Sequence, residues 1–371
     1  MVDTYIPFLD LSTRDQGLVA ELSEAFARVI SRGRFVLGPE VTAFEREFAT
    51  FCGAREAVGV ASGTDALILA LRSLGISPGD EVITPALSAP PTAVAVSLAG
   101  GRPVFVDIHP ETRCIDPDKI EEAIGPRTRF LLVVHLYGRV ADMRELARIA
   151  DEHGLAIVED CAQAHGARAH GRSAGTWSRA GCYSFYPTKN LGAYGDGGAV
   201  ITDDTELARR LRRLRDYGRV DRDRLGEIGM NSRLDELQAS FLRVKLRRLE
   251  EWNRRRRELA RRYREGLEGL PLDLPAWDGE EDHCFHLFAI GCDKRDELRL
   301  HLEGKGIETA VHYPVPLHLH DPYLEGGRPV FSCPEAERFC ARAVSLPLHP
   351  SLTDEEQDAV ILAVRDFYRR R

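Results

Sequence analysis

One stretch of the chain, residues 155–200, constrains the fold and the chemistry more than any other. It reads LAIVEDCAQAHGA, then a connector, then GCYSFYPTKNLGAYGDGGAV. A first apolar strand ends at Asp160, and a second carries Ser184, with Lys189 five residues further on. Four glycines follow between residues 192 and 198. Because glycines this dense let the backbone approach another group closely, the stretch predicts a ligand pocket.

Lys189 stands out because most cations of this chain are arginines. The chain has 50 Lys and Arg residues, of which the lysines are Lys119, Lys189, Lys245, Lys294 and Lys305. The other four lie in polar, helix-like segments, where we expect solvated side chains. Lys189 lies between an aromatic strand and glycines, where desolvation would lower its pKa and free the amine for Schiff-base chemistry. Taken alone, it could also pair with a carboxylate at a strand end.

Length and composition describe a globular protein of about two domains. The chain has 371 residues, of which 43% are hydrophobic and 29% charged. No apolar run reaches the roughly 18 residues of a membrane helix, and MVDTYIPFLDLSTRD lacks the features of a signal peptide, so we expect a cytoplasmic protein. The net charge of −8 argues against a nucleic-acid partner. The eight cysteines form no CxxC pair, which predicts buried thiols and no metal site.

Apolar strands and helices alternate after an amphipathic helix at Gln16 to Ser31. The segments AVGVAS, EVIT, PVFVD, RFLLVV and LAIVE are apolar on both faces and are separated by helical patterns. This alternation predicts an α/β fold with a mainly parallel sheet. Ligands bind such sheets beyond the carboxyl ends of the strands, where SGT and EDCAQ lie.

The second half of the chain predicts a smaller domain. Residues from Ser232 to Leu270 follow one long helical pattern, and the acidic neighbours of its arginine run 254–257 favour a solvated or interface face over RNA binding. PLDLPAW ends this helix, and an α/β pattern follows. We therefore expect a large domain at 1–250, including the N-terminal helical segment, and a small C-terminal α/β domain at 251–371.

Three residues are candidates for binding a phosphate. Gly63 and Thr64 open a predicted helix, whose N–H groups and dipole suit an anion, and the Ser184 hydroxyl lies at the same sheet edge. Alone, SGT is also a common helix cap.

Asp160 and Gln163 complete the set of candidates. Asp160 could hold a protonated ring nitrogen, or it could be a structural or capping residue, and Gln163 could donate to a ring oxygen. With Lys189 and the phosphate candidates, they match the needs of pyridoxal 5′-phosphate (PLP): an amine for the aldehyde, an anion for the pyridinium nitrogen and a phosphate anchor.

The chain resembles the PLP-dependent sugar aminotransferases of the DegT/DnrJ/EryC1/StrS family. The similar motifs cover almost the whole length: IPFLDL, GRFVLGPEVTAFEREFA, GVASGTDALILAL, GDEVI, PVFVDI, EDCAQAHGA, SFYPTKNLGAYGDGGA, GMNSRLDELQA and HYPVPLH. The resemblance implies the type I, aspartate aminotransferase-like fold. It also implies that Lys189 forms the Schiff base, that Asp160 pairs with the pyridine nitrogen and that Gln163 contacts the ring hydroxyl.

The resemblance further implies a phosphate site shared between subunits. Gly63, Thr64 and Ser184 would hold the phosphate, and Asn231 would reach it from the neighbouring subunit of a homodimer. One departure concerns Ala89, where many members place an aromatic residue over the cofactor ring. The branch that aminates C3 of nucleotide-linked keto sugars also has a small residue there, although it often has a histidine where Leu87 stands.

The expected reaction is amino transfer, with L-glutamate as donor and a nucleotide-linked (dTDP) 3-keto-6-deoxyhexose as acceptor. His312 and Tyr313 are candidates for sugar contacts, with a polar strand end as the alternative. Other acceptors are a 4-keto nucleotide sugar or a keto-cyclitol. Lys189 argues against relatives that dehydrate or deoxygenate, since these carry histidine there. A PLP-binding regulatory protein is a remote alternative, but no added basic helix-turn-helix is visible.

Overall fold

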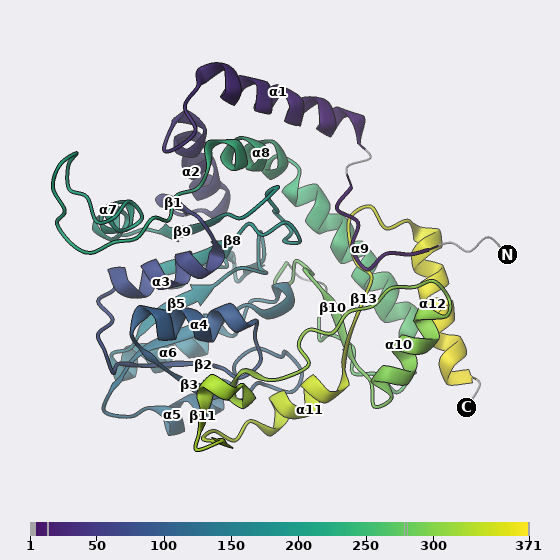
Figure 1. Cartoon of the computed structure of the whole chain (residues 1–371). Coiled ribbons are helices and arrows are strands. Elements are labelled where there is room, and N and C mark those ends of the chain that lie inside the picture. The colour runs from purple at the N-terminus through teal and green to yellow at the C-terminus, as the bar shows by residue number, and fades with distance from the viewer. Residues whose placement is uncertain (1–4, 13–14, 278, 280, 370–371) are drawn as a thin grey trace.

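Figure 1 shows the computed structural model of the chain, which describes residues 5–12, 15–277, 279 and 281–369. Its large part is a seven-stranded sheet in the order β1-β9-β8-β5-β4-β2-β3. These strands span Glu56–Val60 (β1), Glu81–Pro85 (β2), Arg102–Val106 (β3), Thr128–Val134 (β4), Ala156–Asp160 (β5), Ala180–Ser184 (β8) and Gly198–Thr202 (β9).

The sheet is mainly parallel, as the apolar runs predicted. Strands β3, β2, β4, β5 and β8 run parallel to one another. Strand β9 is antiparallel to both of its neighbours, β8 and β1. It returns along β8 because the connection between them, residues 185–197, contains no helix that carries the chain across the sheet.

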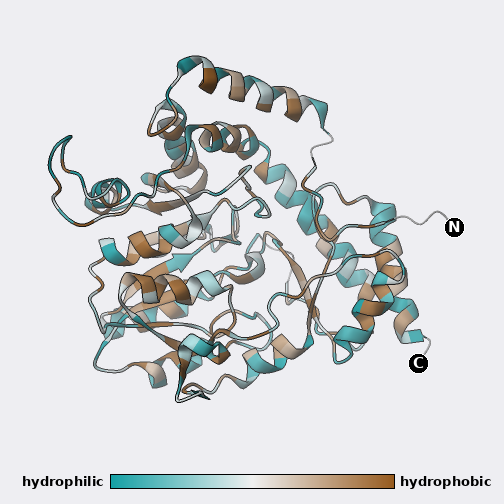
Figure 2. Ribbon diagram, in the orientation of Figure 1, coloured by the Kyte–Doolittle hydropathy of each residue, from teal (hydrophilic) through white to brown (hydrophobic). Residues whose placement is uncertain are grey.

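Helices cover both faces of this sheet (Figure 1). One hydrophobic cluster joins the strands to α3, α4 and α7, and another joins them to α2, α6 and α8. Figure 2 shows hydrophobic residues concentrated on the strands between these helices, which explains their continuously apolar sequences. The helices span Pro39–Cys52 (α2), Gly63–Ser73 (α3), Pro90–Ala99 (α4), Ile120–Ala123 (α5), Met143–His153 (α6), Thr205–Leu214 (α7) and Glu236–Leu246 (α8).

The C-terminal part has its own hydrophobic cluster. Its antiparallel strands β10 (Phe288–Gly291) and β13 (Ala343–Leu346) pack with helices. These helices are α9 (Leu249–Leu267), α10 (Arg295–Glu303) and α12 (Asp354–Arg369), whereas α11 (Pro334–Arg342) packs in a separate cluster with Leu136 and Tyr137. The N-terminal residue Ile6 pairs with Ile307 and joins the same cluster. The division at residue 250 stays a prediction, and Ile6 links the first residues to the smaller part.

The remaining elements are peripheral or short. The predicted first helix is confirmed as α1 (Gln16–Arg32), which packs on α8. In the part of the chain that the structure describes, two hairpins and four 3-10 helices complete the fold: Arg168–Ala169 (β6), Arg172–Ser173 (β7), Leu324–Glu325 (β11), Arg328–Pro329 (β12), Pro117–Lys119 (η1), Leu136–Gly138 (η2), Leu317–Leu319 (η3) and Asp321–Tyr323 (η4).

The single long helix expected from Ser232 to Leu270 is wrong. The chain forms α8 and α9, which are separated at residues 247–248. The apolar residues of α8, such as Leu242, pack in the core of the sheet, whereas Leu259 and Tyr263 of α9 pack in the C-terminal core. One apolar stripe in the sequence thus serves two cores, which the helical period alone does not reveal.

The arginine run 254–257 is only partly a solvated face. Arg255 pairs with Asp354 of α12 at 2.7 Å, as an interface residue would. Arg256 is buried and donates to the carbonyl oxygens of Phe285, His286 and Leu348. The expectation of solvation is therefore wrong for Arg256, which ties α9 to the segments around it.

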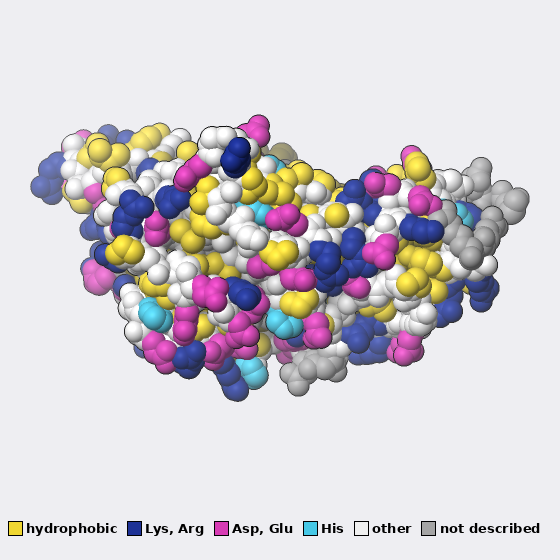
Figure 3. Space-filling view, turned by 90° about the horizontal axis from the view of Figure 1, so that it is seen from below, with side chains coloured by type: hydrophobic (Ala, Val, Ile, Leu, Met, Phe, Trp, Pro, Cys, Tyr) yellow, Lys and Arg dark blue, Asp and Glu magenta, His cyan; other side chains and the backbone are white. Residues whose placement is uncertain are grey.

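Several composition-based expectations can be compared with the structure directly. All eight cysteines are buried free thiols, as predicted. Among the described residues, no helix is long and apolar enough to cross a bilayer. Figure 3 shows acidic and basic side chains interspersed over the face that carries α5, β11 and α11.

Candidate active site

Lys189 lies in the connection from β8 to β9, at the carboxyl edge of the parallel strands. Its backbone N–H donates to the Tyr186 carbonyl at 2.9 Å. The next side chain, the buried Asn190, donates to Asn253 Oδ1 of α9 at 2.9 Å and to the Cys284 carbonyl at 3.1 Å. These contacts fix the loop that carries the lysine.

The environment of Lys189 favours a neutral amine. Burial lowers the pKa of Lys189 to about 8, with the charge of Asp160 acting in the opposite direction. Within the described part of the chain, no side-chain hydrogen bond or ion pair of Lys189 is present. The amine is therefore half deprotonated near pH 8 and free to act as a nucleophile.

Two acidic residues end β5, and the first of them is structural. Glu159 is fully buried, and its Oε2 lies 2.8 Å from His135 Nε2 and accepts from the Gly175 N–H at 2.7 Å. Its Oε1 accepts from Trp177 N and Ser178 Oγ, both at 2.9 Å. Protein donors thus occupy both oxygens, so Glu159 holds the chain after β5 in place.

Asp160 points to the other side of the sheet from Glu159. Its Oδ1 accepts from the Ala162 N–H at 3.1 Å and its Oδ2 from Thr92 Oγ1 at 3.0 Å. Burial raises the pKa of Asp160, whereas these two donors and the Lys189 charge lower it. A buried carboxylate with spare lone pairs beside a lysine is suited to a protonated ring nitrogen.

Gln163 joins the two parts of the molecule. Its Oε1 accepts from the Tyr137 N–H at 2.6 Å, and its Nε2 donates to the Tyr313 hydroxyl at 3.0 Å. These bonds fix the orientation of the amide and leave one Nε2 hydrogen for another acceptor. Tyr313 is therefore brought together with Gln163.

His312 lies on the C-terminal side of the same site. Its Nδ1 is 3.0 Å from Ser345 Oγ, and its ring stacks on Phe8 with centroids 5.6 Å apart. Burial, and then the charge of Lys189, lower the pKa of His312 to about 4, so its ring is neutral at pH 7. A sugar contact for His312 and Tyr313 stays a prediction.

Gly63, Ser184 and Gly198 form a cradle around the start of α3. A Cβ at Gly63 would lie 2.5 Å from Ser184 Cβ, and one at Gly198 would lie 2.3 Å from the Ser62 carbonyl oxygen. Ser62 caps α3, and the N–H groups of Gly63 and Thr64 have no acceptor inside the helix. With the Ser184 hydroxyl, they make a donor set that fits a phosphate.

Asn231 is not brought together with these residues. It is exposed and pairs through its backbone with Asp216, at the end of the projecting segment 217–229 (Figure 1). In the described residues no hydrogen bond connects its side chain to the other cofactor candidates. Its role across a subunit interface stays a prediction.

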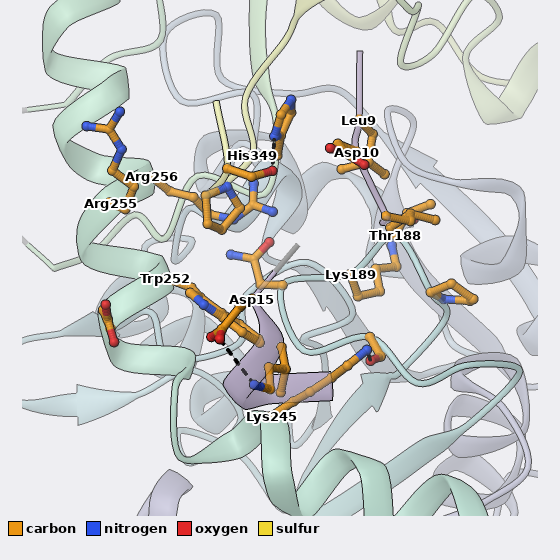
Figure 4. Close-up of a pocket in the computed structure, with 18 of the residues that line it drawn as sticks. Leu9, Asp10, Asp15, Thr188, Lys189, Lys245, Trp252, Arg255, Arg256 and His349 are labelled. Atoms are coloured by element: carbon orange, nitrogen blue, oxygen red, sulfur yellow. Dashed lines mark hydrogen bonds between the residues drawn. The ribbon is translucent and has the colours of Figure 1, made fainter. Parts of the chain in front are cut away.

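A cavity of about 550 Å³ reaches Lys189 from the side of α9. Residues 9–12, Asp15, Leu18 and residues 349–351 are part of its lining, whereas Asp160 is not. Figure 4 shows Lys189 and Lys245 on its wall. Lys245 donates to the Gly192 carbonyl at 2.7 Å and lies 3.6 Å from the centroid of the Tyr194 ring, and burial lowers its pKa to about 8. The expectation of a solvated Lys245 is therefore wrong, because the tyrosine comes from a distant loop.

Two residues at the site were missed in the sequence. Thr92 and Ser88 hydrogen-bond to each other, and Thr92 also bonds to Asp160. Both flank PP at the carboxyl end of β2, and hydroxyls at that edge are the signal that would have found them.

Comparison with known proteins shows close relatives. Residues 17–365 match the profile of the DegT/DnrJ/EryC1/StrS aminotransferase family. The dTDP-3-amino-3,4,6-trideoxy-alpha-D-glucose transaminase of Streptomyces venezuelae is 51% identical over 366 residues, 98% of this chain and 97% of the relative.

Solved structures agree over the same length. The crystal structure of S. venezuelae DesV in complex with a ketimine intermediate gives a TM-score of 0.96 at 51% identity and covers 99% of each chain. The crystal structure of NtdA from Bacillus subtilis with bound cofactor PMP gives a TM-score of 0.91 at 36% identity, covering 98% of this chain and 85% of the other. The expected type I aminotransferase fold is confirmed. The chain belongs to the DegT/DnrJ/EryC1/StrS aminotransferase family.

Proposed function

We propose that this aminotransferase uses PLP and transfers the amino group of an amino acid, L-glutamate, to C3 of a dTDP-linked 3-keto-6-deoxyhexose. The observation that carries the cofactor is the meeting of Lys189, Asp160 and the Gly63–Ser184 cradle at one sheet edge. The acceptor is supported by the 51% identity to a transaminase named for a dTDP-linked 3-amino sugar.

The residues present fit PLP. The cradle at Gly63 and Ser184 leaves no space for a Cβ but offers donors to a phosphate, and Asp160 offers an anion to the ring nitrogen. The remaining hydrogen of Gln163 Nε2 would reach the ring hydroxyl. When bound, PLP would supply an aldehyde that bonds to an amine and a ring that accepts electrons.

Residues of the chain would carry out proton transfer, hold the cofactor ring and contact the sugar. The Lys189 amine, with a pKa of about 8, would accept the proton from Cα of the amino donor as a general base and would return it to C4′ of the cofactor as a general acid. Asp160 would keep the ring nitrogen protonated through its charge. His312, neutral at pH 7, and Tyr313 offer uncharged polar groups to the sugar.

The proposal includes a homodimer with shared sites. Asn231 is exposed, and the segment before it exposes large apolar side chains, with Leu225 at 65% and Ile228 at 90%. Asn231 of one subunit would reach the phosphate held by the other. Mixing Lys189→Ala subunits with Asn231→Ala subunits should then restore activity, since one site of the hybrid has both residues. A monomeric protein, or no recovery in verified hybrids, would contradict this arrangement.

A reverse assay tests the reaction. Purified protein with PLP should convert a dTDP-3-amino-3,4,6-trideoxyhexose and 2-oxoglutarate to the 3-keto sugar and glutamate, and it should act poorly on the 4-amino isomer. Ala89 in place of an aromatic residue also favours the 3-amino sugar. Faster turnover of the 4-amino sugar or of an aminocyclitol would replace the proposed acceptor. The proposal also places the protein in the cytoplasm, which cell fractionation can check.

A further inference from the structure

A chain of buried hydroxyl groups ends on Asp160. Ser88 Oγ lies 2.7 Å from Thr92 Oγ1, which lies 3.0 Å from Asp160 Oδ2. Ser88 is 2% exposed and Thr92 1%. The helix α4 begins at Pro90 and Pro91, whose fixed φ starts the helix between the two hydroxyl residues. The sequence thus places Ser88 and Thr92 four residues apart, on the side facing β5.

The direction of these hydrogen bonds follows from the charge of Asp160. An ionised carboxylate can only accept, so the single hydroxyl proton of Thr92 must point to Asp160 Oδ2. Thr92 then has only lone pairs for Ser88, so Ser88 donates to Thr92. With the Ala162 N–H on Oδ1, each oxygen of Asp160 has one protein donor.

We propose that Thr92, with Ser88 behind it, is a positioning residue that keeps Asp160 ionised and aimed at the ring nitrogen of the cofactor. The inference rests on the proposed use of PLP. Thr92 touches neither the lysine nor the phosphate cradle through any described hydrogen bond, and it acts only through Asp160.

The surroundings of Asp160 explain why the hydroxyl matters. Burial raises the pKa of Asp160, and the donors Ala162 and Thr92 oppose it, followed by the charges of Lys189 and His135. The other titratable neighbours are Tyr313, Cys161 and Cys182, whose own pKa values burial raises, so they stay neutral. Without Thr92 the carboxyl would take up a proton at a higher pH.

The test compares two ligands that differ at one atom. Pyridoxamine 5′-phosphate carries the ring nitrogen, and its 1-deaza analogue carries a carbon there. Thr92→Val keeps the shape of the side chain and removes the hydroxyl. This variant should bind pyridoxamine phosphate about tenfold more weakly at pH 8 and should bind the deaza analogue with unchanged affinity. The acid limb of pyridoxamine phosphate binding should move to higher pH, and Thr92→Ser should restore both properties.

A matched control is available on β2. Thr84 is also fully buried, and its hydroxyl has no hydrogen-bond partner among the described residues, so Thr84→Val removes a buried hydroxyl without touching Asp160. It should change neither affinity. Equal weakening of both ligands in Thr92→Val would overturn the inference, because it would indicate loss of packing rather than of a carboxylate contact.

A second variant covers the case in which Thr92→Val does not fold. Ser88→Ala removes only the hydroxyl that donates to Thr92. It should lower the affinity for pyridoxamine phosphate two- to threefold and leave the affinity for the deaza analogue unchanged. No selective loss in Ser88→Ala would overturn the role of the hydroxyl chain. The parent protein separates this failure from failure of the proposed function: if it binds neither ligand, the use of PLP is wrong.

Discussion

Lys189 and Lys245 have the same altered acidity but different surroundings. Both line one cavity, and burial lowers the pKa of each to about 8 (Figure 4). Lys245 donates to the Gly192 carbonyl and lies against the Tyr194 ring. Lys189 has no such partner among the described residues and lies near the charge of Asp160.

The comparison shows what distinguishes a reactive lysine from an anchoring one. Burial lowers the pKa of both amines to about 8, so a shifted pKa does not identify the nucleophile. The free amine, the nearby carboxylate and the phosphate cradle distinguish Lys189. Lys245 instead holds, through Gly192, the loop in which Lys189 lies.

The largest effect should separate the two lysines directly. Lys189→Ala should lower the rate of amino transfer by about 10⁴-fold or more, because it removes both the nucleophile and the base. Lys245→Ala should keep the cofactor absorbance and lose about 1 kcal/mol of stability with its hydrogen bond. Steady-state rates and thermal melts measure both. A folded Lys245→Ala protein as inactive as Lys189→Ala would erase the distinction.

The next prediction concerns Asp160, the carboxylate whose charge acts on Lys189. Asp160→Asn should lower kcat by about 10²- to 10³-fold, since the ring nitrogen loses the charge that keeps it protonated. Glu159→Gln is the matched change at the adjacent residue. It should lower the melting temperature, because protein donors surround that carboxylate, and leave the spectrum of the bound cofactor unchanged. Equal kinetic loss in both variants would contradict the separate roles.

The phosphate cradle should respond to a single methyl group. Gly63→Ala places a Cβ 2.5 Å from Ser184 Cβ and should weaken PLP binding about tenfold or more. Gly304→Ala is the control, because Gly304 has φ −64° and its Cβ would meet no atom closer than 3.4 Å. Equilibrium dialysis of the apo protein measures both. If Gly63→Ala bound PLP as tightly as the parent protein does, the phosphate site could not be at Gly63.

The smallest effect is the pH dependence of the two amines without cofactor. Only a neutral amine reacts with acetic anhydride, and a pKa of about 8 means that raising the pH from 7 to 9 should increase labelling of Lys189 about tenfold. Lys245 titrates in the same range but should react more slowly, because its amine donates to Gly192 and lies on Tyr194. Mass spectrometry of tryptic peptides reads both rates. Faster labelling of Lys245 would reverse the comparison.

The sequence was sufficient for the residues that share the carboxyl edge of the sheet. Asp160, Ser184 and Lys189 follow apolar strands, and the rule for parallel sheets places ligands at that edge. The hydrogen bond between Thr92 and Asp160 could not be predicted, because it spans 68 residues and depends on where α4 meets β5. The burial of Lys245 likewise depends on Tyr194, which a distant loop places against α8.

The fold was likewise predictable where it depends on local sequence patterns and not where it depends on distant contacts. Continuous apolar strands identify a parallel sheet, but the antiparallel β9 depends on a connection without a helix. The end of α8 at Leu246 was not visible, because the apolar pattern continues into α9 while the core that it serves changes. Hydrophobic periodicity indicates which face of a helix is buried, but it does not identify the residues that pack against that face.

Reduction with borohydride tests the central claim most directly. Treating the PLP-loaded protein should fix a phosphopyridoxyl group on Lys189, which blocks tryptic cleavage there and gives one modified peptide from Ala180 to Arg209. The peptides containing Lys245 should stay unmodified. Attachment at Lys245, or no covalent attachment in protein that binds PLP, would contradict the assignment of Lys189.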